Sequence, residues 1–237
     1  KAFLPLKQGF DEYLGLPYSN DMWPVGYDGQ PVKSGGNKSQ HPPLPLIKND
    51  RPIDTINTLE DQATLTGRLA DAAIQFIRKN KHKPFFAYIP NPMPHVPINA
   101  SPAFRGKSKQ GMYGDVIQEV DYNVGKIMQT LKEEGLDKNT LVIFTSDNGP
   151  WLNFGNHAGS AGGFREGKGT SFEGGQRVPC IMRWKGVLPA GIVANQLAST
   201  IDILPTISAL TKAPLSEKKI DGVDLSPILK GDLTASP

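Results

Sequence analysis

A short apolar run that ends in polar residues constrains this chain more than any other feature. Residues 141–144, Leu-Val-Ile-Phe, are branched or aromatic and too few for an ordinary helix, which predicts a strand buried on both faces, as in a parallel sheet. Asp147 and Asn148 follow almost at once. In open α/β sheets, ligands bind beyond the carboxyl ends of the strands. We therefore expect these two residues to lie at a binding site.

Asp147 and Asn148 also have the chemistry of a metal site. A carboxylate beside a carboxamide oxygen suits a hard divalent cation such as Ca²⁺ or Mg²⁺. The Asp-Asn-Gly triplet is equally typical of turns, because Asn and Gly tolerate left-handed backbone angles, so both interpretations stay open on these residues alone. The glycine-rich stretch that follows contains Lys168 in Gly-Lys-Gly and predicts a loop whose backbone segments approach one another closely.

Helices and strands are expected to alternate on both sides of this stretch, as in an α/β fold. Residues 58–80 predict a helix capped by Thr58 with Asp61 three residues later, and residues 112–134 predict a second helix that Gly135 ends. Residues 85–89, Phe-Phe-Ala-Tyr-Ile, lie between them and predict another buried strand.

Further along the chain, residues 178–184 predict a third strand, which includes Cys180 as an expected core residue. Ser199 is placed to cap a helix that continues to Leu210. Residues 1–57 have no long periodic segment and predict an irregular region with short strands, among them a hairpin at residues 27–30.

Two histidines are candidate site residues. His95 lies in a loop with four prolines just beyond the strand predicted at residues 85–89, at the same sheet edge as Asp147. A lone histidine is more often structural than catalytic, but a proline-fixed loop at a site edge favours a function for His95. His157, inside the glycine-rich stretch, lines the substrate pocket or hydrogen-bonds to hold the loop, and the sequence leaves both roles open.

Three spaced motifs in this region resemble the sulfatase family, in the arylsulfatase-like branch of the alkaline-phosphatase superfamily. They are Thr-Ser-Asp-Asn-Gly at 145–149, Gly-Lys-Gly-Thr at 167–170 and Glu-Gly-Gly-x-Arg-x-Pro at 173–179. The resemblance implies a three-layer α/β/α sandwich with a mostly parallel sheet, of which this chain is the carboxyl-side portion without the N-terminal strands. It divides residues 1–237, a partial catalytic domain, into an irregular excursion (1–57), an α/β core (58–211) and the end of the large domain (212–237).

The resemblance also assigns roles to individual residues. It implies that Asp147 and Asn148 are ligands of a divalent cation, Ca²⁺ or Mg²⁺. It implies that Lys168 and His95 are catalytic and bind the sulfate, with His95 assisting departure of the leaving group, and His157 is a further candidate for substrate binding. Glu173 and Arg177 bracket a Gly-Gly turn, and we expect them to be structural and paired with each other or with the backbone.

The family's nucleophile is a formylglycine made from a Cys-x-Pro-x-Arg or Ser-x-Pro-x-Arg motif, and neither occurs in the 237 residues. Cys180 does not fit, because Ile181, Met182 and Arg183 follow it. We therefore expect the formylglycine upstream of this chain and expect the 237 residues alone to be inactive. Two alternatives stay open: a phosphoester hydrolase of the same superfamily, and a non-catalytic binder of sulfated glycans.

Composition limits the class of partner. The net charge of +3 is too small to predict binding to nucleic acid or a membrane surface, and no apolar run approaches membrane-spanning length. The expected substrate is a sulfate ester, either aryl or carbohydrate sulfate, and the oligomeric state is not specified by the sequence. The resemblance implies a periplasmic, secreted or lysosomal location.

Overall fold

The computed structural model describes residues 2–33 and 35–235 and divides the chain into two compact units. The first unit comprises Lys1–Glu134 and Asp147–Val178, and the second comprises Gly135–Ser146 and Pro179–Pro237. All of the predicted site residues belong to the first unit.

The first unit begins with a small antiparallel sheet in the order β1-β2-β3. Its strands are β1 (Leu14–Gly15), β2 (Leu44–Lys48) and β3 (Arg51–Ile56), with two short 3-10 helices, η1 (Pro5–Lys7) and η2 (Asn37–Gln40), in the same region. Buried apolar side chains join the sheet to the start of α2, namely Trp23, Val25, Leu44, Leu46, Ile56 and Leu65. The hairpin expected at residues 27–30 is a tight turn closed by a hydrogen bond of 2.8 Å from Gly26 N to the Gln30 carbonyl.

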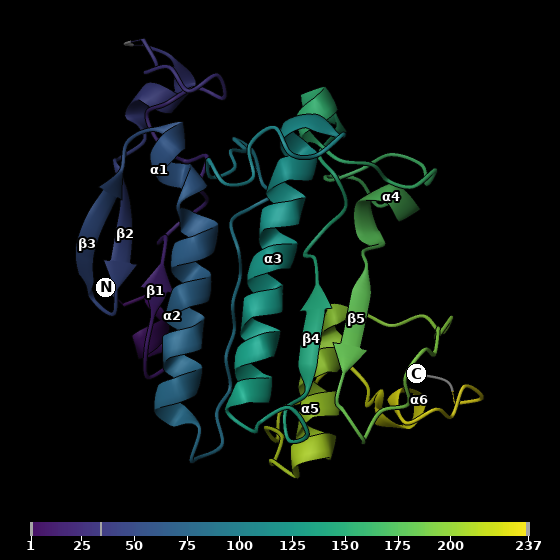
Figure 1. Ribbon diagram of the computed structural model, residues 1–237. Coiled ribbons are helices and arrows are strands. Elements are labelled where there is room, and N and C mark those ends of the chain that lie inside the picture. Colours follow the sequence, from purple (N-terminus) through teal and green to yellow (C-terminus); the bar gives the residue numbers. More distant parts are fainter. Residues whose placement is uncertain (1, 34, 236–237) are drawn as a thin grey trace. The chain divides into compact units, whose positions relative to one another are not determined.

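Three helices follow: α1 (Leu59–Ala63), α2 (Leu65–Asn80) and α3 (Gly111–Glu133), of which α2 and α3 lie side by side (Figure 1). The predicted capping box is present, because the Thr58 side chain accepts from Asp61 N and the Asp61 carboxylate accepts from Thr58 N. Thr64 separates α1 from α2, so the single helix expected over residues 58–80 is two. Gly135, at φ 72°, follows the end of α3, as predicted.

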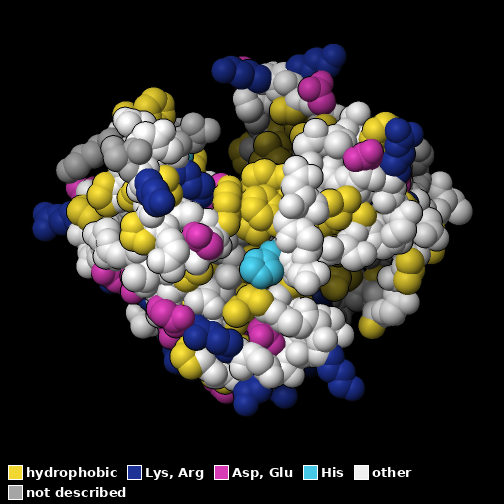
Figure 2. All heavy atoms as spheres, turned by 90° about the horizontal axis from the view of Figure 1, so that it is seen from above, with side chains coloured by type: hydrophobic (Ala, Val, Ile, Leu, Met, Phe, Trp, Pro, Cys, Tyr) yellow, Lys and Arg dark blue, Asp and Glu magenta, His cyan; other side chains and the backbone are white. Residues whose placement is uncertain are grey.

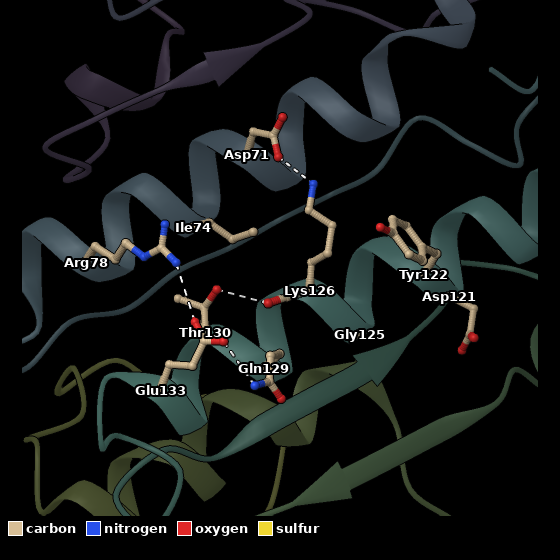
Figure 3. Close-up of a pocket in the computed structure, with 10 residues that line it drawn as sticks. All are labelled: Asp71, Ile74, Arg78, Asp121, Tyr122, Gly125, Lys126, Gln129, Thr130 and Glu133. Carbon is tan, nitrogen blue, oxygen red and sulfur yellow. Dashed lines mark hydrogen bonds and ion pairs between the residues drawn. The ribbon is translucent and has the colours of Figure 1, made fainter. Parts of the chain in front are cut away.

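A hollow of about 560 Å³ lies on the surface between α2 and α3 (Figure 3). Four of the five charged side chains that line it form ion pairs: Lys126 Nζ is 2.6 Å from an Asp71 oxygen, and Arg78 is 3.6 Å from a Glu133 oxygen. None of the predicted site residues lines it. The hollow is a seam between two helices rather than part of the candidate site.

One acidic residue of α3, Asp115, has a structural role that the sequence did not predict. Asp115 is buried and accepts hydrogen bonds from the backbone N–H groups of Ser108 (2.7 Å), Gly106 (2.7 Å) and Lys107 (3.1 Å). These bonds, that of Ser108 first, hold the pKa of the Asp115 carboxyl below its usual value. An acidic residue near a helix start already suits the helix dipole, so the local sequence gives no signal of this further role.

The prediction of a buried strand at residues 85–89 is wrong. The segment has no regular secondary structure and is not part of a sheet in the described portion of the chain. Phe86 is 61% exposed and Tyr88 is 68% exposed, so the segment is not buried either. An apolar run indicates the preference of the side chains, whereas a strand also needs a neighbour to accept its backbone hydrogen bonds.

The second unit contains the strand pair β4 (Val142–Thr145) and β5 (Cys180–Arg183). Both strands lie where the sequence predicts them, but they pair antiparallel, not parallel, with Thr145 opposite Cys180. Their burial was also predicted wrongly: Phe144 is 40% exposed, and Cys180 is exposed instead of lying in a core. No third strand joins the pair among the described residues, which leaves these side chains uncovered.

The rest of the second unit is helical or irregular. A short 3-10 helix, η4 (Thr200–Asp202), leads into α5 (Ile203–Thr211), and α6 (Ser226–Leu229) follows later. Ser199 and Asp202 form a capping box at the start of η4, so the predicted cap and helix are confirmed. Asp137 is buried and binds Arg183 (2.7 Å) and Lys185 (3.0 Å), which fixes the end of β5.

Candidate active site

The three motif segments meet in the first unit through backbone hydrogen bonds. Gly149 N donates to the Gly175 carbonyl (3.0 Å), Lys168 N donates to the Pro150 carbonyl (2.9 Å), and Gly174 N donates to the Arg165 carbonyl (2.9 Å). Segments that are up to 26 residues apart in the numbering thereby form one hydrogen-bonded frame. This frame fixes the backbone of Lys168, from which its side chain extends.

Glycine is required in this frame because the backbone segments leave no room for a Cβ atom. A Cβ at Gly149 would lie 1.8 Å from the Gly174 carbonyl oxygen, and one at Gly174 would lie 2.1 Å from the Glu166 carbonyl oxygen. A Cβ at Gly167 would lie 2.3 Å from the Pro150 carbonyl oxygen. The predicted close approach of backbone segments is confirmed.

Glu173 and Arg177 belong to the same frame, at the ends of the short helix α4 (Glu173–Gln176). Their side chains form an ion pair of 3.1 Å, and both are largely exposed. Arg177 also lies over the Phe164 ring, 4.9 Å from its centroid. The pairing that we expected from the sequence is therefore present.

Two kinds of contact hold the loop that contains His95: packing of apolar side chains and hydrogen bonds of asparagine carboxamides. Met93 and Val96 are buried in a cluster with Val116 of α3. Asn20 Nδ2 donates to the His95 carbonyl (3.2 Å), and the Asn91 carboxamide oxygen accepts from Met93 N (3.1 Å). These bonds satisfy backbone groups of a partly buried loop, as buried polar groups require.

The hydrogen bond of the His95 ring defines its tautomer. Nδ1 lies 2.7 Å from the Val96 carbonyl oxygen, which can only accept, so Nδ1 bears the hydrogen. In the neutral ring Nε2 is then the acceptor nitrogen, and in the imidazolium form Nε2 is the donor. The proton available for chemistry therefore resides on Nε2.

Trp151 is the point at which the His95 loop and the Lys168 loop meet. The His95 and Trp151 ring centroids are 5.7 Å apart, and Lys168 Nζ is 5.0 Å from the centroid of the Trp151 ring. Trp151 also packs against the cluster of Met93 and Val96, immediately before the 3-10 helix η3 (Leu152–His157). Figure 2 shows one face of the protein, on which hydrophobic side chains gather beside a histidine.

We did not identify Trp151 from the sequence. The available signal was a large aromatic residue directly after Asp-Asn-Gly-Pro, where a turn would ordinarily place small or polar residues.

His157 is exposed at the end of η3. Among the described contacts, none joins its ring to His95 or Lys168. Its role in substrate binding stays a prediction.

Asp147 and Asn148 fit a hard cation in donor chemistry but supply only part of a metal site. Asp147 is exposed and Asn148 is half-buried, with Asn148 Nδ2 donating to the Gly149 carbonyl (3.2 Å). Ca²⁺ takes about six to eight oxygen ligands. In the described portion of the chain, no three His, Cys, Asp or Glu side chains are grouped to hold a metal ion. Asp147 and Asn148 would be two ligands among several, and this role stays a prediction.

Comparisons with known proteins agree with the motif resemblance. The family model described as Sulfatase matches residues 1–213. The N-acetylgalactosamine-6-sulfatase of Canis lupus familiaris is 39% identical over 246 residues, covering 99% of this chain and 45% of that protein. Human arylsulfatase A is 38% identical over 239 residues, covering 97% of this chain and 46% of that protein. The chain belongs to the sulfatase family.

A solved structure has a similar fold: the crystal structure of PsFucS1 sulfatase from Pseudoalteromonas sp. superposes with a TM-score of 0.88 at 31% identity. The match covers 100% of this chain and 50% of that one. The chain thus spans about half the length of the relatives that it matches. No helix in the described residues combines the length and apolar character needed to cross a bilayer.

Proposed function

We propose that this chain is the carboxyl-side portion of a sulfatase catalytic domain that hydrolyses a sulfate monoester with a divalent cation. The observation that supports this most strongly is the convergence of His95 and Lys168 on Trp151. Two groups that can be cationic approach one indole from loops more than seventy residues apart in the sequence. A sulfate ester is an anion, and its hydrolysis needs fixed positive charge and a proton donor for the leaving oxygen.

The residues of this chain would divide that chemistry between them. Lys168 would hold the sulfate oxygens by charge-assisted hydrogen bonds, from a backbone position fixed by its bond to the Pro150 carbonyl. His95, as imidazolium, would donate the Nε2 proton to the leaving alkoxide or phenoxide, while its Nδ1–H stays bonded to the Val96 carbonyl. The orientation of the ring would thus remain unchanged when the proton leaves.

The proposed chemistry also needs a divalent cation and a formylglycine nucleophile, neither of which is a residue of this chain. Asp147 and Asn148 would hold a Ca²⁺ or Mg²⁺ ion, which polarises sulfate oxygens when bound. A formylglycine from an upstream segment would provide the attacking oxygen, so we propose that the 237 residues alone do not turn over substrate.

We also propose that the larger protein has a mostly parallel sheet in an α/β/α sandwich, which strands outside this chain complete. The TM-score of 0.88 with a sulfatase of which this chain covers 50% supports this. In that arrangement residues 1–57 would be an excursion, 58–211 the α/β core and 212–237 the end of the domain.

The test is a kinetic comparison in the full-length protein with 4-methylumbelliferyl sulfate and 4-methylumbelliferyl phosphate. We expect cation-dependent hydrolysis of the sulfate ester, which Lys168→Ala and His95→Ala each lower at least about 100-fold. The matched control is Lys132→Ala, a lysine in the last turn of α3, which should leave turnover unchanged. Preference for the phosphate ester would indicate a phosphoester hydrolase, and binding without turnover would indicate a non-catalytic binder.

A further inference from the structure

A row of three aromatic rings extends from the candidate site toward the N-terminal region of the first unit. The Trp151 and Phe154 ring centroids are 4.7 Å apart at 70°, and those of Phe154 and Tyr27 are 4.6 Å apart at 60°. A lysine stands at each end: Lys168 Nζ is 5.0 Å from the Trp151 ring, and Lys38 Nζ is 3.8 Å from the Tyr27 ring.

The far end of this aromatic row is held by a polar network. The Lys38 ammonium donates to the Asp21 carbonyl (2.7 Å), while the hydroxyls of Tyr27 (3.1 Å) and Ser19 (2.6 Å) donate to the two Asp21 carboxylate oxygens. Burial and the Asp21 carboxylate raise the pKa of Tyr27 to about 12, so its hydroxyl is a neutral donor near pH 7. The Asp21 carboxylate thus accepts from two hydroxyls and also attracts the Lys38 ammonium electrostatically, while the ammonium itself donates to a main-chain oxygen.

This arrangement leaves binding capacity at both the rings and the ammonium. An ammonium has three N–H donors, of which the Asp21 carbonyl and the Tyr27 ring face use two. Tyr27 is 36% exposed, and Trp151 and Phe154 are partly exposed. The aromatic row therefore presents apolar ring surface between two ammonium groups, of which that of Lys38 has the Asp21 carboxylate nearby and one N–H donor left for a ligand.

A single aryl sulfate is too short to use this surface, because its ring would reach only the portion nearest Trp151. A sulfated oligosaccharide would use all of it, since sugars combine apolar C–H surface with hydroxyl and anionic substituents. We propose that Trp151, Phe154 and Tyr27 form the wall of a subsite for a sulfated oligosaccharide. Lys38 binds an anionic group, sulfate or carboxylate, on the sugar next to the one that bears the reacting sulfate.

This inference rests on the proposed function, because it takes the reacting sulfate to lie between His95 and Lys168. It adds a substrate class and a specificity residue, Lys38. One relative that the chain matches is an N-acetylgalactosamine-6-sulfatase, whose name specifies a sugar.

The test uses the full-length protein with 4-methylumbelliferyl sulfate and with a panel of sulfated oligosaccharides. The panel pairs glycans that have one sulfate with glycans that have a second sulfate, or a carboxylate, on the neighbouring sugar. We expect Lys38→Gln to lower kcat/KM for the doubly anionic glycans about tenfold to a hundredfold, mainly through KM, and to leave the aryl sulfate unchanged. Lys38→Arg should retain most of the activity, and Lys132→Gln should change neither substrate.

Each other outcome has a defined meaning. Equal kcat/KM for Lys38→Gln and wild type on every glycan overturns the inference, as does cleavage of aryl sulfate with no glycan bound or cleaved. If nothing is hydrolysed, the proposed function fails, and calorimetric binding of the doubly anionic glycans decides the inference separately. Binding that Lys38→Gln weakens supports the subsite, and binding that it leaves unchanged overturns it.

Discussion

The substitution Gly149→Ala tests the frame that joins the three motifs. The added methyl group would lie 1.8 Å from the Gly174 carbonyl oxygen and 2.9 Å from the Gly174 carbonyl carbon. To reach an ordinary van der Waals contact, the backbone segments around Gly149 and Gly174 would have to separate by more than an ångström. Neither atom belongs to a flexible side chain, so the backbone itself has to move.

The expected cost follows from two terms. Overpacking a rigid site costs about 1–3 kcal/mol, and separating the segments breaks the 3.0 Å hydrogen bond from Gly149 N to the Gly175 carbonyl, at about 1 kcal/mol. We expect the free energy of unfolding to fall by about 2–4 kcal/mol. Activity should fall further, since a displacement of about 1 Å can cost about 100-fold in rate and Lys168 is anchored to this frame.

The assay is urea unfolding of the full-length protein, with kcat/KM for 4-methylumbelliferyl sulfate measured where both variants are folded. Gly125→Ala is the matched control because it adds the same methyl group inside α3, where nothing lies within 4 Å of the new atom. Alanine is favoured over glycine in a helix by about 0.5–1 kcal/mol, so this control should be slightly stabilised.

The reasoning would be refuted by a Gly149→Ala variant that unfolds at the wild-type urea concentration and keeps wild-type activity. Such a result would mean that the Gly149 and Gly174 segments separate freely, and the frame would not fix the position of Lys168.

Three further predictions concern stability. Thr58→Ala removes the oxygen that accepts from Asp61 N and should lower the free energy of unfolding by about 1 kcal/mol, with Thr58→Ser restoring it in urea titrations. Glu173→Gln should cost less than about 0.5 kcal/mol, because its ion pair with Arg177 is exposed, and a larger loss in the same assay would contradict a purely local role. Asp115→Asn should lower the melting temperature at neutral pH. The folded-state pKa of Asp115 lies below the unfolded value of about 3.9, so the stability that the carboxylate contributes is fully present above about pH 3.9 and is lost as pH falls through the folded-state pKa. A melting-temperature difference between wild type and Asp115→Asn that does not shrink in acid would contradict this prediction.

Local features of the fold were predictable where the signal lies within a few residues. The Thr58 capping box, the glycine that ends α3 and the strand positions near residues 142 and 180 all follow from short-range chemistry. Pairing direction and burial were not predictable, because they depend on which distant segment lies alongside. The antiparallel pairing of β4 with β5 was not foreseen for that reason, and the buried strand expected at 85–89 was wrong.

The same division applies to the candidate site. His95 and Lys168 were chosen as candidate catalytic residues from their loops and from the family resemblance, and that role stays a prediction. Their common contact with Trp151 was not, since a tertiary contact between two loops leaves no mark in the local sequence. The backbone anchor at Asp115 was missed in the same way, because an acidic residue in the first turns of a helix has a sufficient local explanation.

The glycine frame and η3 differ in how much change they tolerate, and this suggests how substrate range could diverge within one scaffold. Each glycine in the frame faces the carbonyl of another segment, so a single replacement has no partner substitution that restores the fit. Directly beside it, Leu152 is 44% exposed, and Asn153 and Asn156 of η3 are also exposed, so these side chains can be exchanged at little cost in packing, unlike the packed Phe154. Libraries that randomise the exposed positions Leu152, Asn153 and Asn156, and leave Phe154 and the glycines intact, would therefore vary this surface without disturbing the frame that anchors Lys168.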